Sequence, residues 1–175
     1  MHRVLLFTAA CLLSLPFSAQ AEEYYYGLML GNNTYEESGT KITSGSVSGK
    51  LGYRHNEWLS AEVHGGLNGG GSANSVDYDL NWMTSAFAKL SWSAVEDGRI
   101  QLYVLAGFSA AEMEFTSATA ISTTTVDGPS LLVGVDLFAN RNHGIFFQAG
   151  RYLDGTLSGS GYTLDGISLG YISNF

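Results

Sequence analysis

The chain has 175 residues, of which 45% are hydrophobic and 13% aromatic, with 22 glycines, two prolines and a net charge of −8. Such an excess of acidic side chains argues against a nucleic acid or an anionic surface as the partner. Beyond the N-terminal segment, no apolar stretch approaches the roughly 20 residues that a membrane-spanning helix needs, so a helical membrane protein is excluded.

Residues 1–21 are predicted to be a secretory signal peptide that is cleaved before Glu22. Arg3 gives a basic start, an apolar run follows, and Ala19-Gln20-Ala21 has the small-x-small cleavage pattern. The apolar run is too short for a spanning anchor, and the context of Cys11 does not fit a lipoprotein signal. Residues 22–175 then form one domain without cysteine, which its own packing or its surroundings must hold together.

The rest of the chain alternates apolar and polar residues with a period of two, which predicts β-strands, whereas helical periodicity is nearly absent. One face of each predicted strand is apolar; the other is rich in glycine, serine and charges of both signs. In the fourth segment, for example, Leu80, Trp82 and Leu90 share the apolar face, and Asn81 and Lys89 the polar face. The eight predicted strands are residues 24–31, 45–54, 58–65, 80–92, 99–110, 130–138, 144–152 and 165–175.

The connections between these strands indicate where the apolar faces point. In a soluble sandwich or lipocalin-like barrel the apolar faces would form the core, whereas in a membrane barrel they face lipid. Long and short connections alternate along the chain, which is typical of an outer-membrane barrel. The long ones are residues 32–44, 65–79, 112–129 and 154–161, and the short ones are residues 55–57, 93–98 and 139–144.

We therefore predict an all-β fold, an eight-stranded antiparallel up-and-down transmembrane β-barrel, with an interior narrow enough for side chains to fill. Aromatic residues near the short turns are expected to form an interfacial girdle. Several of five residues near these turns should contribute: Tyr24, Tyr53, Trp58, Trp92 and Phe138.

Three stretches resemble the small eight-stranded outer-membrane β-barrels of Gram-negative bacteria, the OmpA/OmpX-like family. They are "YYYGLMLG" at the first strand, "LGYRHNEWLSAEVHGG" at the second hairpin, and the last strand, which ends in Phe175. The resemblance implies localisation in the cell outer membrane, with outer-membrane lipid and lipopolysaccharide as surroundings. It also implies that the barrel assembly machinery reads the C-terminal strand during biogenesis. The positions that match this assembly signal are Ile167, Leu169, Tyr171 and Phe175, whereas Ser173 departs from it.

Four charged residues are expected inside the barrel: Lys50, Glu62, Lys89 and Asp136. A three-residue turn at 55–57 would place Lys50 directly opposite Glu62. The four charges sum to zero, and charges withdrawn from water must be paired. We predict a structural interior charge network, which the resemblance also implies; the alternative is a gate or a proton path.

His64 raises the question of catalysis, because Glu62 lies two residues away on the same face and serines flank it. Outer-membrane lipid A deacylases and palmitoyltransferases are small eight-stranded barrels with such groups. The His-x-Ser pattern of the deacylase is missing, because His64 is followed by Gly65-Gly66. No Cys/His cluster indicates zinc, and the acidic run at 77–79 is too short to indicate calcium. We predict no catalytic, cofactor-binding or metal-binding residue, and a hydrogen-bonded interior histidine.

The long connection at residues 112–129 carries Ile121 and Thr123–Thr125, which have strand propensity. It is predicted to extend its two strands beyond the bilayer as a hairpin whose edge binds partners by strand addition. A binding phenotype that survives deletion of residues 118–125 would speak against this role. The expected function is that of a non-enzymatic outer-membrane protein with a structural or adhesin-like surface role. The alternatives are a lipid A-modifying enzyme, a small pore and a soluble periplasmic barrel.

Overall fold

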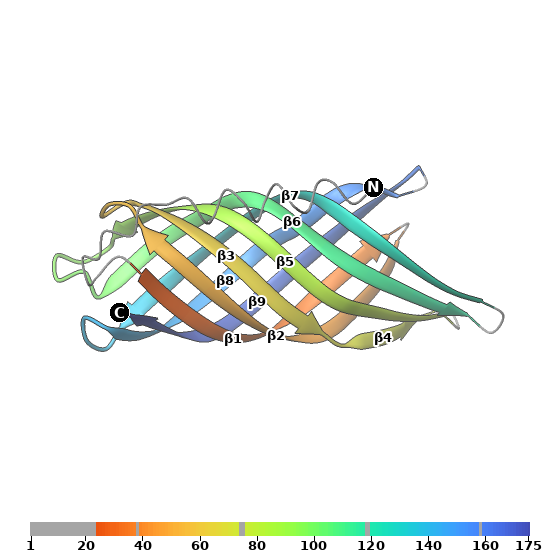
Figure 1. The fold of residues 1–175 in the computed structure, drawn as a ribbon, viewed down its shortest axis with the longest axis horizontal. Helices are drawn as coiled ribbons and strands as arrows, with labels where there is room; N and C mark the ends of the chain where they lie inside the picture. Colours follow the sequence, from red (N-terminus) through yellow and green to blue (C-terminus); the bar gives the residue numbers. More distant parts are fainter. Residues whose placement is uncertain (1–23, 38, 74–75, 118–119, 158) are drawn as a thin grey trace.

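The computed structural model describes residues 24–37, 39–73, 76–117, 120–157 and 159–175 (Figure 1). The predicted signal peptide lies outside the described residues. None of the described residues form a helix long and apolar enough to cross a membrane. The strands are β1 (Tyr24–Glu37), β2 (Thr40–Arg54), β3 (Leu59–Asn68), β4 (Gly70–Ala73), β5 (Val76–Ser93), β6 (Ile100–Ser117), β7 (Ala120–Phe138), β8 (His143–Leu157) and β9 (Ser160–Asn174).

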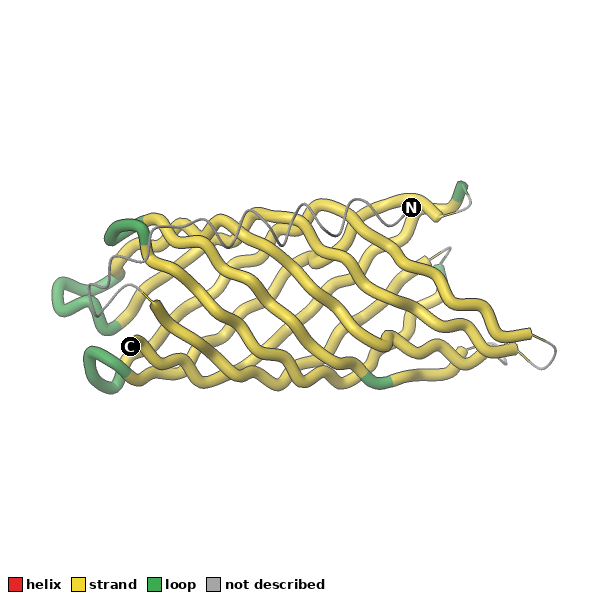
Figure 2. The backbone as a smooth tube through the Cα atoms, in the orientation of Figure 1, coloured by secondary structure: helices red, strands yellow, loops and turns green. Residues whose placement is uncertain are grey.

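The strands form one closed antiparallel barrel (Figure 2). Their order is β3-β2-β1-β9-β8-β7-β6-β5-β4, and β3 also pairs with β5, which closes the wall. Strands β3 and β4 are one crossing interrupted at Gly69, whose N–H donates to the carbonyl oxygen of Gly45 at 2.8 Å. The barrel therefore has eight crossings, and the predicted eight-stranded antiparallel barrel is confirmed.

In the part of the barrel next to the short turns, the outward side chains are apolar and the polar and charged ones point inward, as predicted. Some apolar side chains, such as Leu105 and Phe146, are buried inside with them. Leu28 is 63% exposed and Leu169 is 57% exposed, whereas Lys50 is 4% exposed and Glu62 is 1% exposed. An apolar exterior around a polar interior is stable when the outer wall contacts hydrocarbon. This part of the molecule is called the membrane half below.

Away from the short turns, the wall separates into two four-stranded sheets. Strand β7 pairs with β8 only as far as Leu131↔Arg151, and β2 pairs with β3 only as far as Ser46↔Asn68. The hairpins nevertheless continue, and the β6–β7 ladder runs to Ser117↔Ala120. The two sheets are β2-β1-β9-β8 and β4-β5-β6-β7. Residues 32–45, 70–81, 110–129 and 151–166 are called the extension below.

Polarity is reversed in the extension, where apolar side chains point inward. Two tyrosines, Tyr35 and Tyr162, stack there with ring centroids 6.2 Å apart. Other buried residues of this core are Ile42, Leu80, Met113, Val126 and Leu164.

The predicted β6–β7 hairpin is confirmed, but the prediction of loops in the other long connections was wrong. Residues 32–37 and 154–157, for example, belong to strands β1 and β8. Their Gly, Ser, Thr and Asn content is typical of loops, yet their alternating apolar residues give the extension its core.

Two β-bulges lie where the polarity reverses. One separates Leu80 from Trp82 in β5, and the other separates Arg151 from Leu153 in β8. An extra residue turns the following side chain to the other face. Leu80 therefore points inward and is 6% exposed, so its predicted place beside Trp82 on the outer face was wrong. The Asn81 amide instead donates to Oε1 of Glu112 on the neighbouring strand, at 3.3 Å.

The aromatic girdle forms at the short-turn end with one exception. Trp58 and Trp92 are 57% and 51% exposed. The ring of Tyr24 packs against Tyr53, with centroids 5.2 Å apart. Phe138 does not contribute to the girdle, because it shares strand parity with the inward Asp136 and is 9% exposed.

Candidate functional site: the interior charge cluster and the open edge of β7

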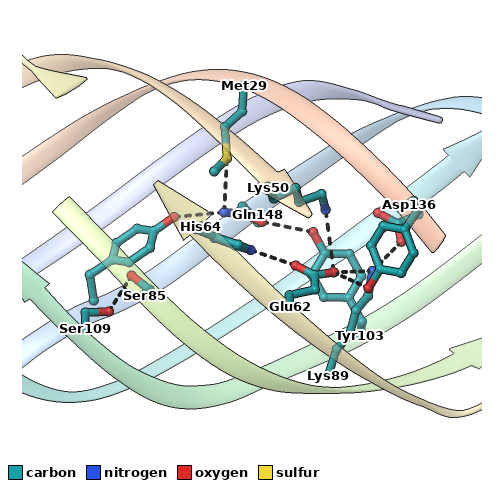
Figure 3. A network of polar contacts seen from close by, with 12 residues as sticks. Met29, Lys50, Glu62, His64, Ser85, Lys89, Tyr103, Ser109, Asp136 and Gln148 are labelled. Atoms are coloured by element: carbon teal, nitrogen blue, oxygen red, sulfur yellow. Dashed lines mark hydrogen bonds and ion pairs between the residues drawn. The ribbon is translucent and has the colours of Figure 1, made fainter. Parts of the chain in front are cut away.

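Glu62 is the centre of the interior polar network (Figure 3). Its Oε1 accepts a hydrogen bond from the Tyr25 hydroxyl at 2.7 Å and lies 3.1 Å from Nζ of Lys89. Nζ of Lys50 lies 3.9 Å from the same oxygen. The other oxygen, Oε2, lies 2.7 Å from Nε2 of His64. One carboxylate therefore contacts both interior lysines.

Asp136 supplies the second negative charge of the network. Its Oδ2 lies 2.8 Å from Nζ of Lys89, which thus bridges Asp136 and Glu62. All four predicted interior charges are less than 5% exposed, and the structure brings them into one connected network with no net formal charge. Mutual compensation of this kind is what makes buried ions tolerable.

Aromatic rings surround the two lysines. Nζ of Lys50 lies 3.6 Å from the ring centroid of Phe146, and Nζ of Lys89 lies 4.1 Å from that of Tyr103. These are favourable cation–π distances. The Tyr103 hydroxyl also donates to Oε1 of Gln148 at 3.4 Å, which links the charge network to a second polar group.

The sequence prediction missed these ring contacts, although a signal for them is present. Each ring lies over an inward glycine on the next strand. A Cβ atom at Gly52 would overlap the ring of Tyr25, and one at Gly134 would overlap the ring of Tyr103. Inward glycine opposite inward tyrosine therefore indicates an aromatic ring lying across the wall.

The predicted register of the second hairpin was wrong by two residues. Lys50 pairs with His64, and Glu62 pairs with Gly52. The turn is wider than predicted because Oδ1 of Asn56 accepts the backbone N–H groups of Trp58 and Leu59. A shift of two residues keeps every side chain on its predicted face, so Lys50 still reaches Glu62 diagonally.

His64 has the surroundings of a structural histidine. Its Nε2 contacts Glu62, and Nδ1 has no hydrogen-bond partner among the described residues. A catalytic triad would place a nucleophile at the second ring nitrogen. Within the same residues, no group of three His, Cys, Asp or Glu side chains could hold a metal ion.

The C-terminal strand presents the predicted assembly signal on its lipid-facing side. Ile167, Leu169 and Tyr171 are 47%, 57% and 40% exposed, and Phe175 is 58% exposed. Ser173, the position that departs from the family pattern, is 4% exposed and lies near the His143 ring. Recognition of these residues by the assembly machinery stays a prediction.

Beyond Leu131↔Arg151, no strand pairs with the side of β7 that faces away from β6 in the described structure, although the backbone of Asp154 on β8 still lies beside Gly128. The hairpin that β7 forms with β6 reaches the far end of the molecule (Figure 1). The Tyr162 hydroxyl on β9 donates to the carbonyl oxygen of Asp127 at 2.9 Å, so this carbonyl points away from β6. Alternate residues of an antiparallel strand face the same neighbour. The N–H and C=O groups of Thr123 and Thr125 therefore also point to the open side. Pro129 has the same parity, and its missing N–H fits the point where the β7–β8 ladder ends.

Comparison with known proteins gives the same architecture. The chain matches the family model described as outer membrane protein beta-barrel domain over residues 6–175. The crystal structure of Neisserial surface protein A (NspA) superposes with a TM-score of 0.70 at 18% identity, covering 87% of this chain and 97% of that chain. Ail, the attachment invasion locus protein of Yersinia pestis, gives a TM-score of 0.60 at 15% identity, covering 86% of this chain and 98% of that chain.

OprG, an outer-membrane protein of Pseudomonas aeruginosa, gives a TM-score of 0.58 at 9% identity, with 89% of this chain and 97% of that chain covered. No curated protein sequence matches the chain. The family match covers nearly the whole chain, and it agrees with the apolar exterior of the membrane half. The chain belongs to the outer membrane protein beta-barrel domain family and resides in the cell outer membrane, with its wall in contact with membrane lipid.

Proposed function

We propose that the protein is a non-enzymatic surface-interaction protein that binds an extended segment of a partner protein at the open edge of β7. The membrane half serves as anchor, and the extension stands outside the cell, because bacterial barrels place their short turns in the periplasm. The edge of β7 between Ile121 and Thr125, which no described strand pairs with, is the observation that carries the proposal.

An added strand would find both hydrogen bonds and side-chain contacts at this edge. Unpaired N–H and C=O groups are a template for another strand. Ile121 is 68% exposed and offers an apolar contact near the tip. Natural edges are often protected by lysine, but in residues 121–127 the single charged side chain is that of Asp127.

The structural neighbours support the fold on which this proposal rests. The name of Ail describes attachment and invasion for that protein. At 15% identity the likeness carries the fold alone, so the proposed role rests on the geometry of β7.

The test replaces single backbone donors at the open edge. Thr123→Pro removes an N–H that points to the open side, and proline is tolerated on such an edge. The matched control is Thr123→Val, which keeps the N–H. Each form is expressed on a non-adherent Gram-negative strain, its folding is checked by the mobility shift between boiled and unboiled samples, and adhesion to cultured epithelial cells is counted. We expect adhesion by the wild type and the valine variant and its loss in the proline variant. Equal adhesion by all three forms, or no adhesion by the wild type, would contradict the proposal.

A lipid A-modifying activity would need His64 as base. Because a nucleophile is missing at its free nitrogen among the described residues, we expect His64→Ala to leave the mass spectrum of lipid A unchanged. Loss of a lipid A modification in this variant would restore the enzymatic alternative.

A pore would need a continuous water path. In the membrane half, the interior is occupied by the buried charges and by the rings that contact them, such as Tyr103 and Phe146. One hollow in the extension, beside Asn33, Ser44 and Leu164, has a volume of about 20 Å³, roughly room for one water. We infer that the four interior charges serve as structural filling, and we expect no steady conductance in planar bilayers.

Assembly is proposed to depend on Phe175, whose ring stacks against Tyr24 with centroids 6.2 Å apart. Phe175→Ala should lower the heat-modifiable fraction in the outer membrane, whereas Phe108→Ala, at an equally lipid-exposed site, should not. Equal assembly of both variants would remove the proposed signal. Lipopolysaccharide around the outer part of the wall follows from the same location and is likewise proposed.

A further inference from the structure

A groove runs across the outer wall of β6, β7, β8 and β9 at the short-turn end. Four outward side chains form its apolar part, and the register places them side by side: Ile100↔Leu137, Leu137↔Ile145 and Ile145↔Tyr171. The groove is shallow and open along most of its length, with a volume of about 550 Å³. Because this wall lies in the membrane, hydrocarbon chains are the apolar groups available to fill it.

Arg99 and His143 line the same groove at its periplasmic side. The Arg99 side chain is 66% exposed and contacts Asp97 through Nε at 3.2 Å. The other two nitrogens of its guanidinium fork are the ones that suit a phosphate, which accepts two parallel hydrogen bonds.

The His143 ring is held in place by two hydroxyl groups. Its Nδ1 lies 2.6 Å from the Tyr171 hydroxyl and 3.2 Å from Oγ of Ser173, and its ring stacks on Tyr171 at 20°. In the tautomer in which Nδ1 accepts the shorter bond, from the Tyr171 hydroxyl, the ring proton lies on Nε2. Nε2 is then a hydrogen-bond donor at the edge of the groove.

We propose that this groove binds one glycerophospholipid of the periplasmic leaflet. Arg99 and Nε2 of His143 hold the headgroup phosphate, and an acyl chain lies over Ile100, Leu137 and Ile145. Charge complementarity carries the choice of occupant. The Arg99 guanidinium and the His143 ring lie where the apolar wall ends, and in a phospholipid the phosphate lies where the acyl chains end. Lipid A is excluded as the occupant, because it lies in the outer leaflet, which surrounds the opposite end of the barrel.

The charge test uses the full-length folded protein, delipidated in mild detergent and titrated with dioleoylphosphatidylglycerol, with bound lipid counted by native mass spectrometry. Arg99→Gln should weaken binding of the first lipid about tenfold, the loss expected for a hydrogen bond to a charged group. The matched control is Arg141→Gln, in the same periplasmic region but outside the groove; it should stay within about twofold. Asp97→Asn should strengthen binding, because it removes the carboxylate that competes for Arg99. Equal weakening by both arginine variants would show general electrostatic attraction and overturn the proposal.

The apolar part is tested by filling the groove. Ile145→Trp should abolish binding of the first lipid, whereas Leu51→Trp, on the far side of the barrel, should leave it unchanged; the two side chains are 51% and 49% exposed. Dioleoylglycerol, which lacks the phosphate, should bind about tenfold more weakly and should not respond to Arg99→Gln. Equal binding of both lipids would mean that the groove takes hydrocarbon without recognising a headgroup, which would also overturn the proposal.

Discussion

The membrane half and the extension are built from the same strands with opposite polarity. In the membrane half, Leu28 and Leu169 point outward and Glu62 and Lys89 inward. In the extension, Leu164 points inward on the same strand that exposes Leu169. A strand that crosses from lipid to water must exchange its faces, because the better solvent for apolar groups changes from outside to inside.

In three of the eight crossings the exchange coincides with a bulge or a strand break. Bulges at Leu80/Trp82 and Arg151/Leu153 insert one residue each, and Gly69 interrupts the crossing formed by β3 and β4. Strand β9 changes polarity without a bulge, since its inward positions pass from Ser168 to Leu164. In a strand of this kind the apolar residues move from one set of alternate positions to the other. Each face keeps its direction, and its polarity follows the surrounding solvent.

The largest effect is expected from removing the centre of the interior network. Glu62→Ala leaves Lys50 and His64 without their carboxylate partner in a site with almost no solvent access. Breaking a buried ion pair by deleting one partner costs about 3–5 kcal/mol. The free energy of unfolding, measured by urea titration in lipid vesicles, should fall by this amount.

The control for this variant lies in the extension. Asp165→Ala breaks an outward ion pair with Arg151, whose Nε lies 2.9 Å from Oδ1 of Asp165. Exposed pairs contribute about 0–1 kcal/mol. Comparable losses in the two variants would show that the interior charges are well solvated and would break the contrast between the two halves.

A charge on the outer wall should distinguish lipid from water. Leu28→Arg places a cation in the apolar band and should cost about 2–4 kcal/mol if it lies near the bilayer midplane. Thr43→Arg, outward on β2 in the extension, should change stability by about 0.5 kcal/mol at most. The same urea titration measures both variants. Equal stability of the two would show that the boundary between lipid and water does not lie between Leu28 and Thr43.

The apolar core of the extension should lose more stability on truncation than the polar interior of the membrane half. Leu164→Ala removes a side chain that is 1% exposed and should cost about 2–3 kcal/mol, at the lower end for buried leucine because the two sheets can close on the space. Ser168→Ala, four residues along on the same strand, should cost about 1 kcal/mol. Hydrogen exchange of the β9 amides reports the difference, and protection lost equally in both variants would contradict a separate apolar core.

The smallest effect concerns alkaline pH. Burial, with a hydrogen bond of 2.7 Å from its hydroxyl to Oε2 of Glu37, raises the pKa of Tyr35 well above its ordinary value of 10.0. The folded state therefore keeps this proton when the unfolded chain has lost it, and the stability from this group is complete below about pH 10 and falls as the pH rises further. Between about pH 9 and pH 11 the wild type should lose about 1 kcal/mol more stability than Tyr35→Phe. Parallel denaturation curves for the two proteins would show that Tyr35 is not protected.

Much of this architecture can be predicted from residue parity. Alternation places Lys50, Glu62, Lys89 and Asp136 on one side of their strands, because side-chain direction in a strand depends on parity alone. The extra residue of a bulge interrupts this parity, and no local sequence pattern predicts where a bulge lies. For this reason Leu80 was predicted on the outer face, whereas it points inward.

Features that depend on a specific hydrogen bond or on long-range packing were not predictable in this way. The register of the second hairpin follows from the Asn56 side chain, and turns with other hydrogen bonds have other lengths. The extension is strand and not loop because Tyr35 on β1 meets Tyr162 on β9, far along the chain. The contact of Tyr25 with the interior network can be predicted only when Gly52, which leaves room for the Tyr25 ring, is considered together with it.

The fit between rings and glycines has a consequence for how the barrel assembles. Tyr25 faces Gly52, Phe87 faces Gly107, Tyr103 faces Gly134 and Phe146 faces Gly170, in each case across neighbouring strands that are close in sequence. A slip of two residues would preserve every polar and apolar face, and alternation alone would not reject it. After such a slip each aromatic ring would overlap the side chain of a residue that is not glycine. The ring–glycine contact therefore selects the correct register in each of these strand pairs. Alignment errors can thus be rejected pair by pair during assembly, before the barrel closes.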